Sequence, residues 1–116
     1  MGGDQGRLAR RAPVTYPHFI RAAAELEIRR ALDYYAINVP HKLVDLEAAI
    51  DEVIGRITES PQHARERVAD VRCAFVHGFP YQAWYVWHEN QRVVEVIAFL
   101  HARQDRAPIV ERHGPV

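Results

Sequence analysis

The apolar residues of this chain change their spacing once, from steps of three and four before residue 60 to steps of two after residue 70. Steps of three and four place side chains on one face of an α-helix, whereas steps of two place them on one face of a β-strand. A chain that keeps the two patterns in separate halves is typical of the α+β class, in which helices cover one face of an antiparallel sheet. The sequence therefore predicts helices first and a sheet second.

The first half predicts two consecutive helices, which Pro40 separates because proline disfavours helical geometry at the residue before it. The first runs from His18 to about Asn38, with Pro17 in its first turn, where the missing N–H has no partner to lose. The second begins at once and ends near residue 59, so the pair predicts an antiparallel helical hairpin. The apolar positions are Ile20, Ala24, Ile28, Ala31 and Tyr35, then Leu43, Leu46, Ile50, Val53, Ile54 and Ile57.

The second half predicts strands. Val71, Cys73 and Phe75 alternate with other residues, and the segments 81–88 and 92–101 are rich in β-branched and aromatic side chains and flank a polar turn. Residues 61–70 are polar and predict a loop. We therefore expect an N-terminal helical hairpin packed on one side of a sheet of three or four antiparallel strands, whose other side is left free for function.

Composition narrows the functional classes. Lys plus Arg and Asp plus Glu each total 15, and this balance argues against a nucleic-acid-binding protein, whose affinity comes from a basic excess. The apolar run 93–100 contains Glu95 and is much shorter than the roughly 20 residues of a membrane-spanning helix, so we expect no transmembrane segment. Cys73 stands alone, which excludes an internal disulfide and fits a reducing cytoplasm. We expect a flexible leader at 1–12, one domain at 13–108 and a C-terminal tail at 109–116.

Five short motifs occur along the chain in a fixed order: Tyr34-Tyr35, Ser60-Pro61, Val71-Arg72, Phe79-Pro80-Tyr81 and Leu100-His101-Ala102-Arg103. In this order and at this spacing the chain resembles the RelE/ParE family, the toxins of bacterial type II toxin–antitoxin (plasmid stabilisation) systems. The resemblance covers roughly residues 14–108.

The resemblance implies a cytoplasmic bacterial toxin that a partly disordered cognate antitoxin wraps and blocks. RelE-like relatives cleave mRNA on the ribosome as mRNA interferases, whereas ParE-like relatives poison DNA gyrase without cleaving RNA. A third alternative is a toxin fold of reduced activity that serves mainly as an antitoxin-binding module. Neither a cofactor nor a membrane partner is implied, and the oligomeric state stays open.

Position by position, the resemblance places Arg72 on the Arg that begins the strand after the helices. His77 stands where many relatives carry Arg, and Arg103 and Arg106 fall in the basic stretch at the end of the last strand. No counterpart follows Arg106 for the C-terminal Tyr that some RNA-cleaving relatives use. This departure, together with the neutral charge, favours the gyrase-directed alternative.

Cleavage of RNA by its 2′-hydroxyl requires a proton acceptor, a proton donor and cations around the phosphate. Side chains of the right types lie in the matched segments, and aromatic side chains stack on unpaired bases. The candidates are His77 and His101 for acid–base catalysis, Arg72, Arg103 and Arg106 for charge stabilisation, and Tyr81 and Tyr85 for binding the substrate.

Each candidate also has a structural interpretation. His101 can hydrogen-bond at the end of the sheet, and Arg72 and Arg103 can pair with carboxylates of the helices or contact an acidic antitoxin segment. Aromatic side chains that alternate along a strand must in part face the helices as core. The seven His residues show no His-x-x-x-His or Cys-x-x-Cys spacing, so we expect no metal site.

Overall fold

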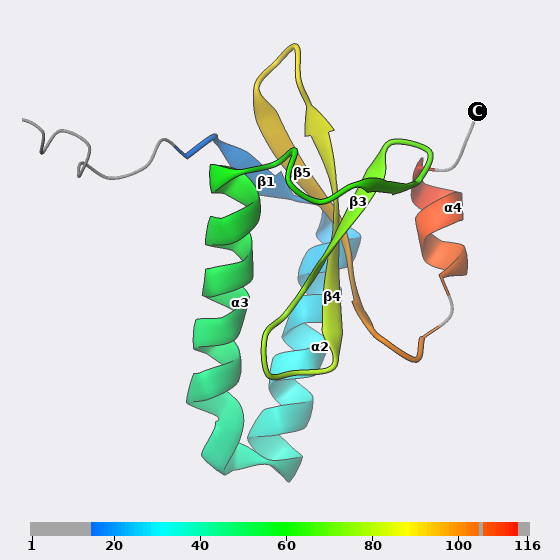
Figure 1. Cartoon of the computed structure of the whole chain (residues 1–116). Coiled ribbons are helices and arrows are strands. Elements are labelled where there is room, and N and C mark those ends of the chain that lie inside the picture. Colours follow the sequence, from blue (N-terminus) through cyan, green and yellow to red (C-terminus); the bar gives the residue numbers. More distant parts are fainter. Residues whose placement is uncertain (1–14, 105, 114–116) are drawn as a thin grey trace, which may run out of the picture.

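The computed structural model describes residues 15–104 and 106–113, so the predicted leader at 1–12 lies outside the described residues. These residues form an α+β fold, as predicted from the change of spacing (Figure 1). In chain order, the elements are strand β1 (His18–Ile20), helix α2 (Ala22–Asn38), the 3₁₀ turn η2 (Pro40–Lys42), helix α3 (Leu43–Glu59), strands β2 (Glu66–Val68), β3 (Val71–Phe75), β4 (Tyr81–His88) and β5 (Val93–His101), and helix α4 (Ala107–His113).

The strands form one five-stranded mixed sheet in the order β1-β5-β4-β3-β2, which corrects the prediction of three or four antiparallel strands. β1 pairs parallel with β5, with His18 opposite Val94, and the other neighbouring strands are antiparallel. The carbonyl oxygen of Pro17 accepts the N–H of Val94 at 3.0 Å, so Pro17 precedes a strand and not a helix. The hairpin is therefore not N-terminal, and a three-residue strand carries no periodic pattern that could have predicted it.

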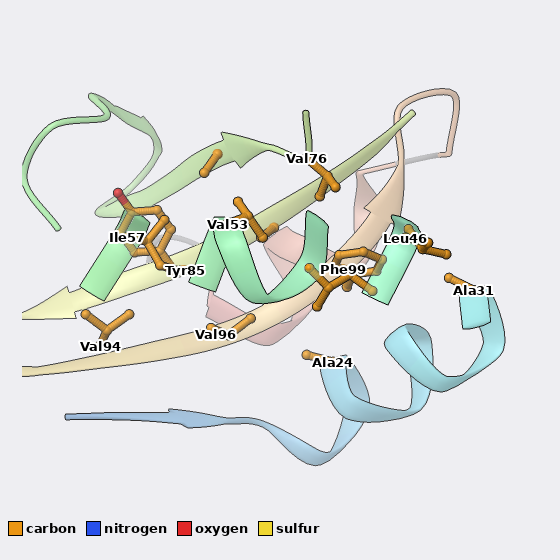
Figure 2. Close-up of a cluster of buried hydrophobic side chains, with 13 residues drawn as sticks. Ala24, Ala31, Leu46, Val53, Ile57, Val76, Tyr85, Val94, Val96 and Phe99 are labelled. Carbon is orange, nitrogen blue, oxygen red and sulfur yellow. The ribbon is translucent and has the colours of Figure 1, made fainter. Parts of the chain in front are cut away.

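Helices α2 and α3 form the predicted hairpin, and their ends at Asn38 and Glu59 agree with the prediction. The backbone N–H of Val39 donates to the carbonyl of Tyr35 at 2.9 Å and closes α2 before Pro40. The hairpin packs on one side of the sheet, where apolar side chains of both helices meet those of β4 and β5 (Figure 2). The labelled members of this core are Ala24, Ala31, Leu46, Val53, Ile57, Val76, Tyr85, Val94, Val96 and Phe99.

The second side of the sheet is also covered, so the expectation of a free side is wrong. Trp84 and Val86 of β4 and Leu100 of β5 form a second buried cluster with Ile109 of α4. Figure 1 shows α4 on the opposite side of β3 and β4 from α3. Residues 109–113, which fall in the predicted tail, form most of α4, while residues 114–116 lie outside the described residues.

Side chains cap the edge of β5 beyond the end of its pairing with β1. Glu27 of α2 accepts the backbone N–H of Phe99 at 2.9 Å through Oε1. Arg112 of α4 donates to the carbonyl of Ile97 at 2.9 Å and holds both oxygens of Glu27, at 3.1 and 2.9 Å. Such two-point pairs fix orientation as well as distance. The pair thus joins α2 and α4, which cover opposite sides of the sheet, at one strand edge.

A second ionic group lies at the other end of β5. The buried carboxylate of Glu95 accepts hydrogen bonds from Arg21 at 2.5 and 2.9 Å and lies 2.8 Å from Nε2 of His88. Burial raises the pKa of Glu95, but the hydrogen bonds from His88 and Arg21 together lower it by more. The net pKa is therefore below the ordinary value of 4.5. The folded state therefore favours the ionised carboxylate.

We predict that Glu95→Gln destabilises the fold at neutral pH by about 1–3 kcal/mol, because a charged hydrogen-bonding group in a buried network is lost. A carboxyl whose pKa is lowered on folding stabilises the protein above its unfolded-state pKa, and this stabilisation disappears as the pH falls through the folded-state value. Urea denaturation at several pH values should show the difference between the two proteins shrink below about pH 4. A difference that stays constant from neutral to acid pH would contradict this assignment.

We also predict that Ile109→Ala lowers the free energy of unfolding by about 2–4 kcal/mol, because it leaves a cavity between α4 and the sheet. Val110→Ala is the matched control, since the neighbouring Val110 is 52% exposed. Thermal and urea denaturation measure both changes. Equal, small losses for the two variants would show that α4 does not pack on the sheet.

Candidate functional site

A cleft of about 500 Å³ lies between α2 and the adjacent ends of β4 and β5. One wall is a face of α2, and the other comes from the start of β4, the end of β5 and the segment after it. We call it the α2 cleft. Its lining residues are Glu27, Arg30, Ala31, Tyr34, Tyr35, Pro80, Tyr81, Phe99, His101 and Gln104.

The aromatic part of the α2 cleft is centred on Tyr81. Its ring stacks on Phe99, with centroids 5.2 Å apart. It lies T-shaped to the His101 ring at 5.5 Å and tilted to the Tyr35 ring at 6.3 Å. Burial raises the pKa of Tyr81, and the neighbouring Tyr35 and Tyr34 add to the rise. The Tyr81 hydroxyl therefore stays protonated at neutral pH and remains a hydrogen-bond donor.

The segment after β5 fixes the imidazole of His101. Its Nδ1 accepts the backbone N–H of Arg103 at 3.1 Å, and its own backbone N–H donates to Oε1 of Gln104 at 3.2 Å. Because Nδ1 is an acceptor here, the neutral ring carries its proton on Nε2. Sequence reasoning weighed a structural role for His101 against a catalytic one, and this geometry allows a structural Nδ1 and a functional Nε2 together.

The acidic and the basic side chain that line the α2 cleft differ in their ion pairing. The carboxylate of Glu27 is already held by Arg112 and by the backbone N–H of Phe99. Arg30, by contrast, is exposed and makes no ion pair or hydrogen bond within the described part of the chain. The cleft thus presents an unpaired cation beside a neutralised acid.

Two of the proposed residues serve the loop that precedes β2. Nη1 of Arg72 donates to the carbonyls of Ala64 at 2.5 Å and Gln62 at 3.3 Å, and its Nη2 lies 3.5 Å from Glu66. Tyr85 is 1% exposed, and its hydroxyl donates to the carbonyl of Pro61 at 2.9 Å. Burial raises the pKa of Tyr85 to about 12. Both side chains hold residues 61–66 against the sheet.

The other proposed residues lie apart from one another. His77 is in the turn after β3, 70% exposed, with Nδ1 3.7 Å from Oε1 of Glu52 on α3. The guanidinium of Arg106 lies 5.4 Å from the ring centre of Trp84, on the side that α4 covers. The structure therefore brings Tyr81, His101 and the backbone of Arg103 together, and places Arg72, His77, Tyr85 and Arg106 elsewhere.

Sequence reasoning missed the α2 side of the cleft. Arg30 and Gln104 belong to none of the five motifs that carry the resemblance. The Tyr34-Tyr35 pair was part of the resemblance but was given no role. A helical projection separates the core face from the face with Arg30 and Tyr34, but it cannot show that strand ends lie opposite.

None of the described helices has the length and apolar content needed to cross a membrane. Within residues 15–104 and 106–113, no three His, Cys, Asp or Glu side chains come together as a metal site would require. Cys73 is buried, and burial raises the pKa of its thiol to about 11, so the thiol is not ionised at neutral pH.

No protein-family model matches the sequence, and no curated protein matches it. The fold is similar to a solved structure entitled "Chromosomal ParDE TA system from P. aeruginosa", with a TM-score of 0.62. The match covers 75% of this chain and 96% of that chain at 13% sequence identity. At this identity the likeness is one of fold, and it confirms the fold that the resemblance to RelE/ParE toxins implied.

We predict that Arg72→Gln destabilises the fold by about 1–3 kcal/mol, because it leaves carbonyls of the 61–66 loop without their donor. Arg65→Gln in the same loop is the matched control, since Arg65 is exposed and makes no polar contact within the described residues. Urea denaturation compares the two. An Arg72→Gln protein as stable as the control would show that Arg72 does not anchor this loop.

Proposed function

We propose that this protein is the growth-inhibiting toxin of a bacterial type II toxin–antitoxin pair, held inactive by a cognate antitoxin. The observation that carries the proposal is the likeness of fold to a chain from a ParDE system, which extends over 96% of that chain. The five ordered motifs of the sequence support it independently, because they are a likeness of sequence and not of fold. The protein would act in the bacterial cytoplasm, where its antitoxin and both known targets of such toxins lie.

Of the two modes of action, we favour ParE-like binding to DNA gyrase. A ribonuclease needs its base, acid and cations around one phosphate. Of the proposed residues, Tyr81 and His101 line the α2 cleft, whereas the guanidinium of Arg72 donates to loop carbonyls and that of Arg106 lies over Trp84. The zero formal net charge also supports a protein target over an RNA target.

The second candidate is an mRNA endoribonuclease centred on the α2 cleft. The geometry of His101 supports it, since the neutral ring presents a proton on Nε2 beside the unpaired Arg30. In this mode the Nε2–H of His101 and the guanidinium groups of Arg30 and Arg103 would bind the phosphate oxygens, and Tyr81 would stack on a base. Solvent water would take the proton of the 2′-hydroxyl and supply one to the leaving oxygen. A toxin fold of reduced activity that mainly binds antitoxin remains the third alternative.

We predict that expression of the chain without antitoxin arrests bacterial growth, with gyrase trapped on broken DNA and transcripts intact. Covalent gyrase–DNA complexes and transcript ends, measured from the same induced culture, separate the two modes. Normal growth at verified soluble expression would contradict toxin activity and favour the third alternative, an antitoxin-binding module.

Cleaved transcripts with intact chromosomes would instead establish the ribonuclease, and then Arg103→Ala and His101→Ala should abolish cleavage. His41→Ala is the control, because His41 is exposed in η2, outside the residues that line the cleft. Full toxicity of Arg103→Ala under these conditions would contradict a role for Arg103 in cleavage.

A further inference from the structure

Three side-chain nitrogen donors of the α2 cleft have no partner among the described residues. The guanidinium of Arg30 makes no polar contact there. Nε2 of His101 carries the ring proton, because Nδ1 accepts the N–H of Arg103. The amide nitrogen of Gln104 is unbound, while its oxygen accepts the N–H of His101. One cation and two neutral N–H donors therefore line the same cleft.

The α2 cleft offers no competing free carboxylate. Glu27 is the acidic residue of the lining, and Arg112 binds both of its oxygens. A cleft with unpaired donors and a neutralised acid attracts an acceptor that carries negative charge. Charge complementarity thus specifies an anionic group.

The rim of the cleft continues into an exposed apolar stripe on α2. Leu26, Arg30, Tyr34 and Ile37 follow one another at steps of four, four and three, so they lie on one face of the helix. Leu26 is 46% exposed, Tyr34 56% and Ile37 78%. Large apolar side chains gathered on an exposed face mark an interaction surface. Arg30 and Tyr34 belong to both the stripe and the cleft.

We propose that the α2 cleft binds the carboxylate of an acidic residue on a partner protein, whose neighbouring aliphatic side chains cover the α2 stripe. The guanidinium of Arg30 binds the carboxylate, and Nε2 of His101 and the amide of Gln104 donate to its remaining lone pairs. The identity of the partner rests on the proposed function, because the cognate antitoxin is the protein that such a toxin binds.

A nucleic acid fits this surface less well. Successive phosphates require a row of cations, whereas Arg30 is the guanidinium that lines the cleft and Asp33 follows it one turn along α2. Ile37 and Leu26 would find no apolar partner along a phosphate backbone. A carboxylate places a single charge, which one guanidinium can bind through two hydrogen bonds.

The test uses hexanoate, a carboxylate on an aliphatic chain, as the probe. Titration of the ¹⁵N-labelled protein, followed by NMR, should shift the signals of α2 around Arg30 and of residues 101–104, with a dissociation constant in the millimolar range. Hexanamide, the neutral analogue of equal size, should bind roughly tenfold more weakly because it lacks the charge. Uridine 5′-monophosphate, the nucleotide probe, should also bind more weakly than hexanoate.

Arg30→Gln should weaken hexanoate binding roughly tenfold, because it removes the cation of the cleft. Arg29→Gln is the matched control: Arg29 is exposed, adjacent in sequence and outside the lining, so it removes the same charge from the same helix. Both variants should melt at the temperature of the parent protein, since neither side chain has a polar contact within the described residues.

Three results would overturn the proposal: no binding of hexanoate, binding that Arg29→Gln weakens as much as Arg30→Gln, or tighter binding of the nucleotide than of hexanoate. These results are independent of the growth assay. Growth arrest without hexanoate binding would support the proposed toxin function and contradict the carboxylate site. Hexanoate binding without growth arrest would support the carboxylate site and contradict the proposed toxin function.

Discussion

The pair between Glu27 and Arg112 at the edge of β5 holds the rest of this structure in place. Glu27 accepts the backbone N–H of Phe99, and Arg112 donates to the carbonyl of Ile97, so the pair also satisfies backbone groups of β5 that lie beyond its pairing with β1. Unpaired backbone groups at such a buried edge would be costly. The pair sets the position of α2, which forms a wall of the cleft, and of α4, which covers the second side of the sheet.

The cleft follows from this arrangement. With Glu27 bound to the strand edge, the next turns of α2 carry Arg30 and Tyr34 past the ends of β4 and β5, where Tyr81 and His101 face them. The carboxylate that fixes the helix is thereby neutralised, and Arg30, one turn further along the helix, has no partner among residues 15–104 and 106–113. The same contact therefore organises the fold and leaves the cleft selective for an anionic group. A surface that binds a partner protein is best carried by such a rigid framework.

Long periodic segments were predictable from the sequence and short ones were not. The ends of α2 and α3 and the strands that begin at Val71 and Tyr81 agree with prediction, because each carries its own apolar pattern. β1 has three residues and exists through its register with β5, and α4 depends on the burial of Ile109, so neither was foreseen.

For the site, His101 and Tyr81 were identified through the family resemblance. The role of Arg72 in holding a loop, and the part that Arg30 plays in the cleft, depend on tertiary contacts that no local spacing encodes.

The central claim is that the α2 cleft and stripe form the surface by which this protein meets its antitoxin. Hydrogen exchange of the protein alone and in complex with its antitoxin tests it most directly. The account predicts new protection of backbone amides at residues 27–37 and 99–104. Protection confined to α4 or to the edge strand β2, with the cleft unchanged, would contradict it.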